Sequence, residues 1–274
     1  MEEKMISVIV PIYNGRKYIP NLIRMIERNA ENICCAVELI LVNDSPQINI
    51  DDLVNSSVIK IISISNKKNM GIHYSRVHGI SHSHGEFILM LDQDDEINDN
   101  FLISQLSKIG KADMIISNGY IESDSEKLIL YRFRIVQWTA KHLLFHIIFG
   151  NRITSPGQCL IKKKCIPEIW FKRIVKNNGA DDYLLWMLVL YNGAKIKINP
   201  ETIYTHCFVG SNASMNSEAM NASVAEILEI VKANTKMRKS SYKFIKNRLS
   251  GKKTLIYKII DILQKINDNI KRKY

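Results

Sequence analysis

The sequence predicts an α/β fold in which helices flank a mostly parallel sheet. Short runs rich in β-branched residues alternate with stretches of helical period through the first half of the chain. A composition of 46% hydrophobic and 24% charged residues is typical of a globular protein. The length of 274 residues is enough for one large domain or two smaller ones.

The first half contains four predicted strands and two predicted helices. The strands are expected at residues 6–12, 37–42, 58–64 and 86–91, and the helices at 18–28 and 73–83. Strands and helices in this order favour parallel strand pairing with helices on both faces of the sheet.

The second half has a less regular pattern. A strand is expected at residues 114–117, a helix around residues 138–149, and a loop at residues 154–158 that leads into residues 159–162. Shorter extended pieces are expected at residues 195–198 and 202–208. Asp181 and Asp182 open an apolar helical run over residues 183–191, and carboxylates at a helix start are favoured by the helix dipole.

Polar and acidic residues follow the predicted strands of the first half. Pro11, Tyr13 and Asn14 follow the first strand, Asp44 follows the second, and Asp92-Gln93-Asp94-Asp95 follows the fourth. Ligands of parallel sheets bind beyond the carboxyl ends of the strands, so we expect a site at this rim.

The acidic run at residues 92–95 has two interpretations. Three carboxylates in four residues repel one another, and a divalent cation with oxygen ligands would hold them together. The alternative is an acidic turn that caps the following helix. Asp44 on a neighbouring loop favours a nucleotide whose phosphates bridge to the metal. Neither a GxGxxG nor a GxxxxGK[ST] motif is present, which argues against dinucleotide redox chemistry and P-loop phosphoryl transfer.

The formal net charge of +11 is confined to the end of the chain. Residues 232–274 hold 14 Lys plus Arg and two acids, whereas residues 1–231 hold 24 basic and 25 acidic residues. Apolar residues of the tail recur at helical spacing at positions Ile256, Ile259, Ile260, Leu263, Ile266 and Ile270. This basic amphipathic helix is expected either to pack on the body or to dock on an anionic membrane leaflet. Few aromatics and no base-reading module argue against nucleic acid as a partner.

The sequence also bears on the cellular compartment. The acidic start carries no signal peptide, no run of 18 apolar residues occurs, and the five cysteines have no CxxC spacing. We therefore expect a cytoplasmic protein, peripheral at the inner face of the plasma membrane through its tail, with buried thiols in place of disulfides or a zinc site.

The motifs together resemble those of family 2 inverting glycosyltransferases over roughly residues 5–215. The similarity is carried, in order, by Val8-Ile9-Val10-Pro11-Ile12-Tyr13-Asn14, Ile40-Leu41-Val42-Asn43-Asp44-Ser45, Asn69-Met70-Gly71 with Ser75-Arg76 and Gly79, and Gly85-Glu86-Phe87-Ile88 running into Leu91-Asp92-Gln93-Asp94-Asp95. The resemblance implies a GT-A-type domain at residues 1–231, with a donor-binding half at about residues 1–118 and an acceptor half at about 119–215. The change in charge sets the basic tail at residues 232–274 apart from this domain.

The resemblance also implies roles for individual residues. Pro11, Tyr13, Asp44, Arg76 and Asp92 are similar to the family's nucleotide-binding residues. Asp92, Asp94 and His206 are similar to its ligands for Mn²⁺ or Mg²⁺, with Ser211, Asn212 and Ser214 in the same late segment. Asp182 matches the catalytic base. The resemblance places four further residues either on the acceptor side of the site or behind the binding groups, as their support: Asp95, Gly157, Gln158 and Asp181.

The implied activity is transfer of a sugar from a nucleoside diphosphate sugar, of UDP type, to the hydroxyl of a saccharide or lipid-linked saccharide in cell-surface polysaccharide synthesis. Two alternatives stay open: a membrane-associated protein that binds nucleotide sugars without turnover, and a phosphatase of the haloacid dehalogenase type, whose DxD motif normally follows the first strand. Residues 143–149, flanked by Trp138, are interpreted as buried core or as a surface facing a lipid-linked acceptor.

Overall fold

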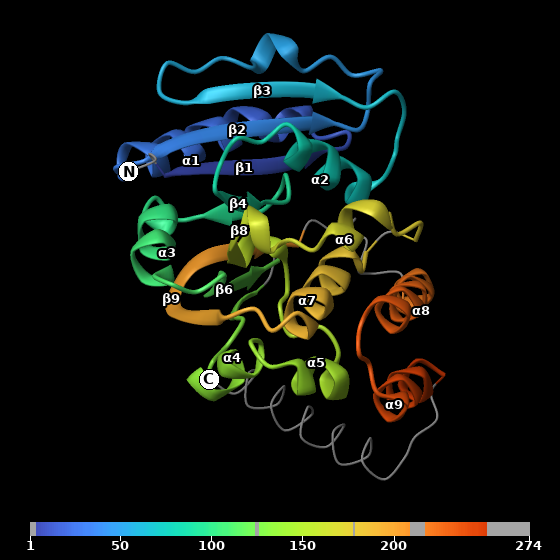
Figure 1. Cartoon of the computed structure of the whole chain (residues 1–274). Helices are drawn as coiled ribbons and strands as arrows, with labels where there is room; N and C mark the ends of the chain where they lie inside the picture. The colour runs from blue at the N-terminus through green and yellow to red at the C-terminus, as the bar shows by residue number, and fades with distance from the viewer. Residues whose placement is uncertain (1–3, 124–125, 178, 209–216, 251–274) are drawn as a thin grey trace.

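The protein is described by a computed structural model at residues 4–123, 126–177, 179–208 and 217–250. A nine-stranded sheet runs through the described part of the chain, with helices on both of its faces (Figure 1). The order of the strands across the sheet is β3-β2-β1-β4-β8-β6-β9-β5, and β7 pairs with β6. The strands are β1 (Met5–Ile12), β2 (Ala36–Asn43), β3 (Lys60–Ser65), β4 (Phe87–Met90), β5 (Glu96–Ile97), β6 (Met114–Glu122), β7 (Lys127–Ile129), β8 (Cys159–Lys162) and β9 (Ile196–Cys207).

The α-helices in the described residues connect these strands, except for the last two, which follow β9. They are α1 (Ile19–Glu31), α2 (Ile72–Ser81), α3 (Phe101–Ile109), α4 (Arg134–Thr139), α5 (Leu143–Phe149), α6 (Glu168–Lys172), α7 (Asp181–Tyr191), α8 (Ser217–Asn234) and α9 (Lys239–Leu249). The helix expected at residues 138–149 is thus two helices, α4 and α5, because residues 140–142 leave the helical path between them.

The α/β class is confirmed, but the sheet is mixed where a mostly parallel one was expected: among the described strands, four pairs are parallel and four are antiparallel. Strands β1, β2, β3 and β4 pair in parallel, as the alternation of strands and helices predicted. In the second half, β8 is antiparallel to both β4 and β6, whereas β9 is parallel to β6. The two extended pieces expected at residues 195–198 and 202–208 form one strand, β9, whose pairing with β6 shifts register near Asn118.

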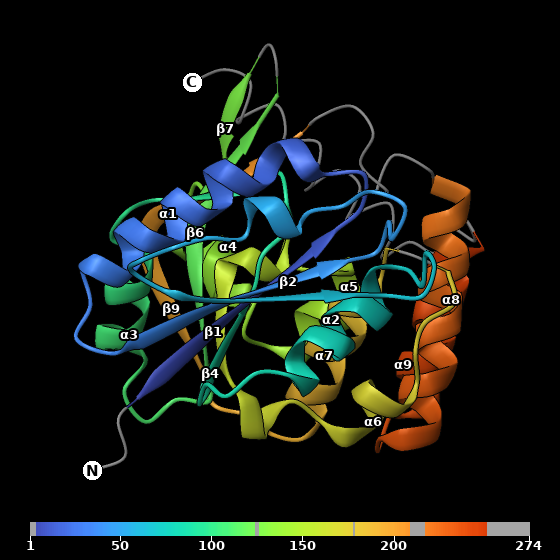
Figure 2. The same cartoon turned by 90° about the horizontal axis from the view of Figure 1, so that it is seen from above.

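Both faces of the sheet are buried, which explains the nearly continuous apolar runs of the central strands. Val8 and Val10 of β1 pack with Leu22 of α1, while Ile9 points to the opposite face and packs in the cluster that contains Ile80 of α2. Helices α1 and α2 accordingly lie on opposite sides of the sheet (Figure 2). Strands that are buried on both faces lose the alternation of apolar and polar residues.

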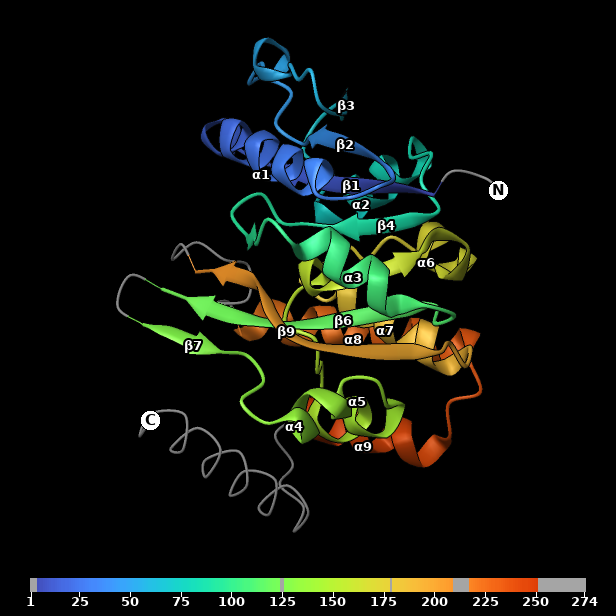
Figure 3. The ribbon, with the colours of Figure 1, turned by 90° about the vertical axis from the view of Figure 1, so that its left-hand side faces the viewer.

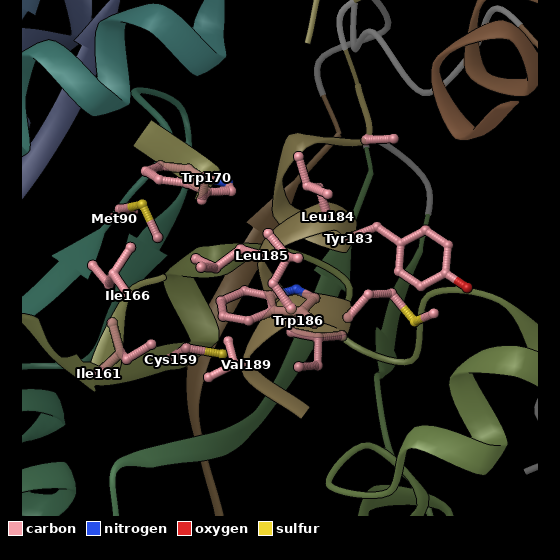
Figure 4. Packing of buried hydrophobic residues seen from close by; sticks show 14 of the residues in the cluster. Met90, Cys159, Ile161, Ile166, Trp170, Tyr183, Leu184, Leu185, Trp186 and Val189 are labelled. Carbon is pink, nitrogen blue, oxygen red and sulfur yellow. The ribbon is translucent and has the colours of Figure 1, made fainter. Parts of the chain in front are cut away.

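Helix α7 forms the centre of the larger hydrophobic cluster. Trp186 is fully buried, and so is Trp170 of α6. Figure 4 shows Trp186 and Leu185 in the cluster to which β4 and β8 contribute Met90 and Cys159. Because residues all around α7 are buried, its sequence shows little amphipathic periodicity.

The basic tail begins within packed structure. Helix α8 runs through residue 232, and Ile245 of α9 is buried in the same cluster as α7. The apolar stripe expected at residues 256–270 lies outside the described residues. Among the helices that are described, none is both long enough and apolar enough to cross a bilayer.

Helix α2 approaches the sheet closely at one glycine. A Cβ atom at Gly79 would lie 2.4 Å from Cγ2 of Ile9 and 3.0 Å from Cγ2 of Val42. Real Cβ contacts are longer, so the absence of a side chain at residue 79 sets the separation of α2 from β1 and β2. This separation matters for the site described below because α2 carries Arg76.

We expect Gly79→Ala to lower the free energy of unfolding by about 1–2 kcal/mol, because overpacking a core costs about 1–3 kcal/mol and outweighs the gain of about 1 kcal/mol in helix propensity. Urea denaturation followed by circular dichroism measures the change, with Ser81→Ala on the exposed side of the same helix as control. Combining Gly79→Ala with Ile9→Ala should cost less than the sum of the single changes. Additive losses would contradict the proposed contact.

Candidate active site

The carboxyl ends of β1, β2 and β4 meet at one rim and open into a cavity of about 620 Å³. The parallel register places Ile12 beside Asn43, and Leu91 donates its backbone N–H to Ile9. Nine of the residues singled out from the sequence line this cavity: Pro11, Tyr13, Asp44, Arg76, Asp92, Asp94, Asp181, Asp182 and His206. Residues as far apart in the chain as Pro11 and His206 are therefore brought together, as the rim prediction required.

Asp44 occupies a buried position at the end of β2. Its Oδ1 accepts hydrogen bonds from the Asn66 side chain and the Met70 backbone, both at 2.7 Å, and its Oδ2 accepts one from the Gly71 backbone at 2.9 Å. Gly71 has a φ of 85°, in the region that favours glycine, and directly precedes α2. Two carboxylate oxygens offer about four acceptor positions, so one position remains for a ligand donor.

The loop that carries Tyr13 is held by two residues that sequence reasoning did not single out. The amide side chain of Gln93 accepts from Tyr13 N at 2.9 Å and donates to Tyr13 O at 3.1 Å, which is the pattern of a paired backbone. Ser45 Oγ accepts from the Asn14 backbone at 2.9 Å, and Asn14 has a positive φ of 50°. The Tyr13 ring is half-exposed on this anchored loop.

Asp92, Asp94 and Asp95 differ in what they face. Asp92 is paired with Arg76, whereas Asp94 lines the cavity and forms no ion pair within the described residues. Burial together with the charges of Asp95 and Asp92 raises the pKa of Asp94 to about 6. Asp95 is fully buried and lies behind the cavity wall. It accepts from His206 Nδ1 at 2.8 Å, from Cys207 N at 3.1 Å and from the Tyr204 hydroxyl.

Asp95 therefore orients His206 from behind. With Nδ1 directed to Asp95, the Nε2 atom of His206 remains for the cavity, which is the usual arrangement of a metal-binding histidine. Although burial alone would lower the pKa of His206, the hydrogen bond to Asp95 and the surrounding carboxylates raise it. Ser211, Asn212 and Ser214 of the same segment lie outside the described residues.

The residues present fit a divalent cation that takes some of its ligands from the protein and the others from a bound phosphate. In the part of the chain that the structure describes, no three His, Cys, Asp or Glu side chains converge well enough to hold an ion by themselves. Mg²⁺-type sites commonly use one or two carboxylates and complete their shell with water and substrate phosphates. Asp94, Asp92 and His206 supply that partial set. Burial, and after it the charges of Asp95 and Asp92, raise the pKa of Asp94, which a nearby cation would counteract.

Arg76 of α2 is buried between two acidic loops. Its Nη2 donates to Asp92 at 2.5 Å and its Nη1 donates to Asp181 at 2.7 Å, and its side chain is 4% exposed. Burial alone would lower the pKa of this guanidinium, but Asp181 and Asp92 raise it, so Arg76 stays charged. The arginine thus lines the cavity while both of its terminal nitrogens bind protein carboxylates.

Asp181 and Asp182 begin α7 and have opposite electrostatic surroundings. Burial would raise the pKa of Asp181, but Arg76 lowers it below its ordinary value. Burial and the adjacent charge of Asp181 raise the pKa of Asp182 to about 7, against the opposing charge of Arg76. A pair of carboxyl groups separated in this way is typical of acid and base assignments in active sites.

Asp182 is oriented by two donors. Tyr183 N donates to its Oδ1 at 2.6 Å, and Asn151 Nδ2 donates to its Oδ2 at 3.0 Å. Sequence reasoning missed Asn151, which follows α5 and carries no local motif. Its pairing with a residue 31 positions away is visible only in the fold.

Gly157 and Gln158 support the site from behind and do not line the cavity. A Cβ at Gly157 would lie 2.6 Å from the Tyr204 ring, so glycine makes room for the tyrosine that contacts Asp95. Gln158 is buried, accepts from Thr154 N at 2.9 Å and donates to Ser117 O at 3.0 Å. The neighbouring Thr154, Ser155 and Pro156 line the cavity in their place, together with Lys17, Asn69 and Met220.

Comparison with known proteins identifies similar sequences. Residues 7–170 match the family described as "Glycosyl transferase family 2". "Glycosyltransferase GlyG" of Streptococcus pneumoniae serotype 4 is 28% identical over 185 residues, which cover 61% of this chain and 60% of that protein. "Undecaprenyl-phosphate 4-deoxy-4-formamido-L-arabinose transferase" of Salmonella choleraesuis is 33% identical over 95 residues, which cover 33% of this chain and 29% of that protein.

Two solved structures show the same fold. S. aureus TarS 1–349 in complex with UDP-GlcNAc has a TM-score of 0.65 at 18% identity, over 90% of this chain and 72% of that one. The mannosyltransferase PcManGT from Pyrobaculum calidifontis, in complex with GDP-Man and Mn²⁺, has a TM-score of 0.63 at 12% identity, over 89% and 68%. These likenesses confirm the predicted GT-A-type fold. With a family match over more than half of its length, the chain belongs to glycosyl transferase family 2.

Proposed function

We propose that this chain is an inverting glycosyltransferase that moves a sugar from a nucleoside diphosphate sugar, of UDP type, to an acceptor hydroxyl. One observation carries the proposal: a single cavity joins a carboxylate with one acceptor position left, a partial cation site and a carboxyl whose pKa is about 7. These groups are needed to hydrogen-bond the nucleobase, to bind the diphosphate and to remove a proton from the attacking hydroxyl.

The donor would lie between Asp44 and the acidic loop. The remaining acceptor position of Asp44 suits the imino N–H of uracil, and the Tyr13 ring beside it offers a face to the base. Asp92, Asp94 and His206 would hold Mn²⁺ or Mg²⁺ together with the diphosphate. When bound, the ion supplies positive charge that stabilises the leaving nucleoside diphosphate.

Asp182 would act as the general base of a single displacement. Its carboxylate takes the proton of the acceptor hydroxyl while the hydroxyl oxygen attacks the anomeric carbon and the bond to the diphosphate breaks. One displacement inverts the configuration at that carbon. Arg76 keeps Asp181 ionised, and the charge of Asp181 in turn raises the pKa of Asp182 toward the value that suits a base near neutral pH.

Two related proteins bear on the donor and the acceptor. The Salmonella relative is a transferase to undecaprenyl phosphate, and TarS was solved with UDP-GlcNAc. We extend this to a saccharide or lipid-linked saccharide acceptor for the present chain, used at the cytoplasmic face of the membrane with the basic tail as a contact. If the chain is instead a binding protein without turnover, the nucleotide sugar would bind in the same cavity but no nucleoside diphosphate would be released.

Replacing Asp182 by Asn should retain donor binding and lower transfer by about two to four powers of ten, because the amide cannot accept the acceptor proton. Calorimetry with the nucleotide sugar measures binding, and release of nucleoside diphosphate measures turnover. Asn234→Asp, a change of the same atoms on the exposed end of α8, serves as control. Unchanged turnover in Asp182→Asn would rule out its role as base.

The rate should rise with pH through an apparent pKa of about 7 and level off above it, because the base works in its ionised form. The apparent value belongs to the Asp181–Asp182 pair. Asn151→Ala removes a hydrogen bond that favours ionised Asp182, so the rising limb should move to higher pH. Rates at a series of pH values for both proteins check this, and an unshifted limb would contradict the role of Asn151.

Chelation by EDTA should abolish transfer, and Mn²⁺ or Mg²⁺ should restore it, because the cavity lacks enough positive charge for a diphosphate leaving group. Asp94→Asn should raise the concentration of metal needed for half-maximal activity. Titration of activity with metal measures both effects. Full turnover in excess EDTA would refute the metal assignment.

A further inference from the structure

Helices α4 and α5 expose large apolar side chains that form a patch. Phe133, Ile135, Trp138 and Leu144 are 46%, 65%, 39% and 59% exposed. They are half of the eight large hydrophobic side chains that are exposed in the described chain, yet they lie within 12 residues. We call these four residues the α4–α5 patch. Clustered exposed apolar side chains mark interaction sites more often than single ones do.

The segment of the sequence that contains the patch has basic but no acidic residues. Residues 127–167 contain no Asp or Glu and eight basic residues: Lys127, Arg132, Arg134, Lys141, Arg152, Lys162, Lys163 and Lys164. Arg132 lies over the Phe133 ring at 5.7 Å and Lys141 lies over the Trp138 ring at 6.0 Å. Within the described residues, Arg134 and Lys141 form no ion pair.

Hydrogen bonds connect helix α5 and the loop after it to the candidate base and its neighbour at the start of α7. Asn151, directly beyond α5, donates to Asp182, and the Tyr183 hydroxyl donates to the backbone oxygen of His146 in α5 at 2.7 Å. Two adjacent residues at the start of α7 are thus held by α5 and the loop after it. Helix α5, which carries Leu144 of the patch, is therefore joined to the part of α7 that carries Asp182.

The basic tail leaves the described structure at the same place. Arg248 of α9 donates to the backbone oxygens of Ile147 and Ile148 in α5, at 3.2 and 3.0 Å. Figures 1 and 3 both show α4, α5 and α9 gathered at the end of the molecule away from β3. The residues after Ser250 hold seven further basic and two acidic side chains.

We propose that the α4–α5 patch docks on the surface of an anionic phospholipid bilayer. Apolar and aromatic side chains beside Arg and Lys suit the boundary between acyl chains and headgroups. The chain's own tail is less suited than an anionic bilayer to cover the patch, because the tail is basic like the Arg and Lys residues beside the patch. A bilayer here would bring a lipid-linked acceptor to the side of the cavity that holds Asp182, a consequence that rests on the proposed function. The docking itself is independent of that function.

Tryptophan fluorescence of the full chain tests the docking directly. The sequence has three tryptophans; Trp170 and Trp186 are fully buried, so changes at the surface report on Trp138. Vesicles of phosphatidylglycerol in phosphatidylcholine should shift the emission to the blue and protect it from acrylamide, and phosphatidylcholine vesicles should not. If Trp138 is already protected from acrylamide before vesicles are added, and vesicles change nothing, the tail covers the patch and the proposal is wrong.

Paired substitutions locate the docking surface. Ile135→Ser with Leu144→Ser, and separately Arg134→Glu with Lys141→Glu, should each weaken vesicle cosedimentation about tenfold or more, since one basic residue near the surface contributes about fivefold. Ile103→Ser with Lys111→Glu makes one change of each kind on and after α3 and should bind like the unaltered chain. Thermal unfolding checks that each variant is folded.

Two results separate the alternatives. Unchanged binding of both patch variants, with binding lost in Lys258→Glu combined with Lys265→Glu, would assign docking to the tail alone and overturn the proposal. Vesicle binding needs no turnover, so a preparation that docks but releases no nucleoside diphosphate supports the docking surface and contradicts only the proposed function.

Discussion

The buried guanidinium of Arg76 joins the two halves of the candidate active site. It binds Asp92 on the loop after β4 and Asp181 at the start of α7, which are far apart in the chain and belong to different parts of the sheet. A buried charge of this kind is costly unless it is paired, and removal of one partner leaves the others uncompensated. The position of α7, and hence of Asp182, is therefore tied to the loop that is proposed to bind the diphosphate.

The location of Arg76 depends in turn on how α2 meets the sheet. Asp44 binds the backbone of Met70 and Gly71 and fixes the start of the helix, while Gly79 lets its last turns approach Ile9. The residue proposed to bind the nucleotide base is thus also a structural anchor of the helix that carries the arginine.

Electrostatics divide the acidic residues of the cavity into different roles. Arg76 compensates Asp92 and Asp181, and His206 and Tyr204 hydrogen-bond Asp95, whereas Asp94 and Asp182 keep raised pKa values of about 6 and about 7. Burial also raises the pKa of Asp95, but Asp95 lies behind the cavity wall. Asp94 and Asp182 combine a raised pKa with a place in the cavity lining, where the proposed reaction needs one beside a cation and one as base. Asn151, in the loop after α5, binds the second of them, so the helix that carries Leu144 of the α4–α5 patch leads directly to the candidate base.

The sequence by itself determined the α/β class, the strands and helices of the first half, and most residues of the cavity. These features depend on local periodicity and on a rule of parallel sheets, by which the residues after β1, β2 and β4 share one rim. Tertiary structure alone decided which carboxylates pair with Arg76, that Asp95 faces inward, and that Gln93 and Asn151 hold Tyr13 and Asp182. It also decided that the apolar run from Trp138 to Phe149 is partly exposed, with Leu144 outside and Ile147 inside. Such contacts depend on strands that join the sheet out of chain order, so no local pattern of residues encodes them.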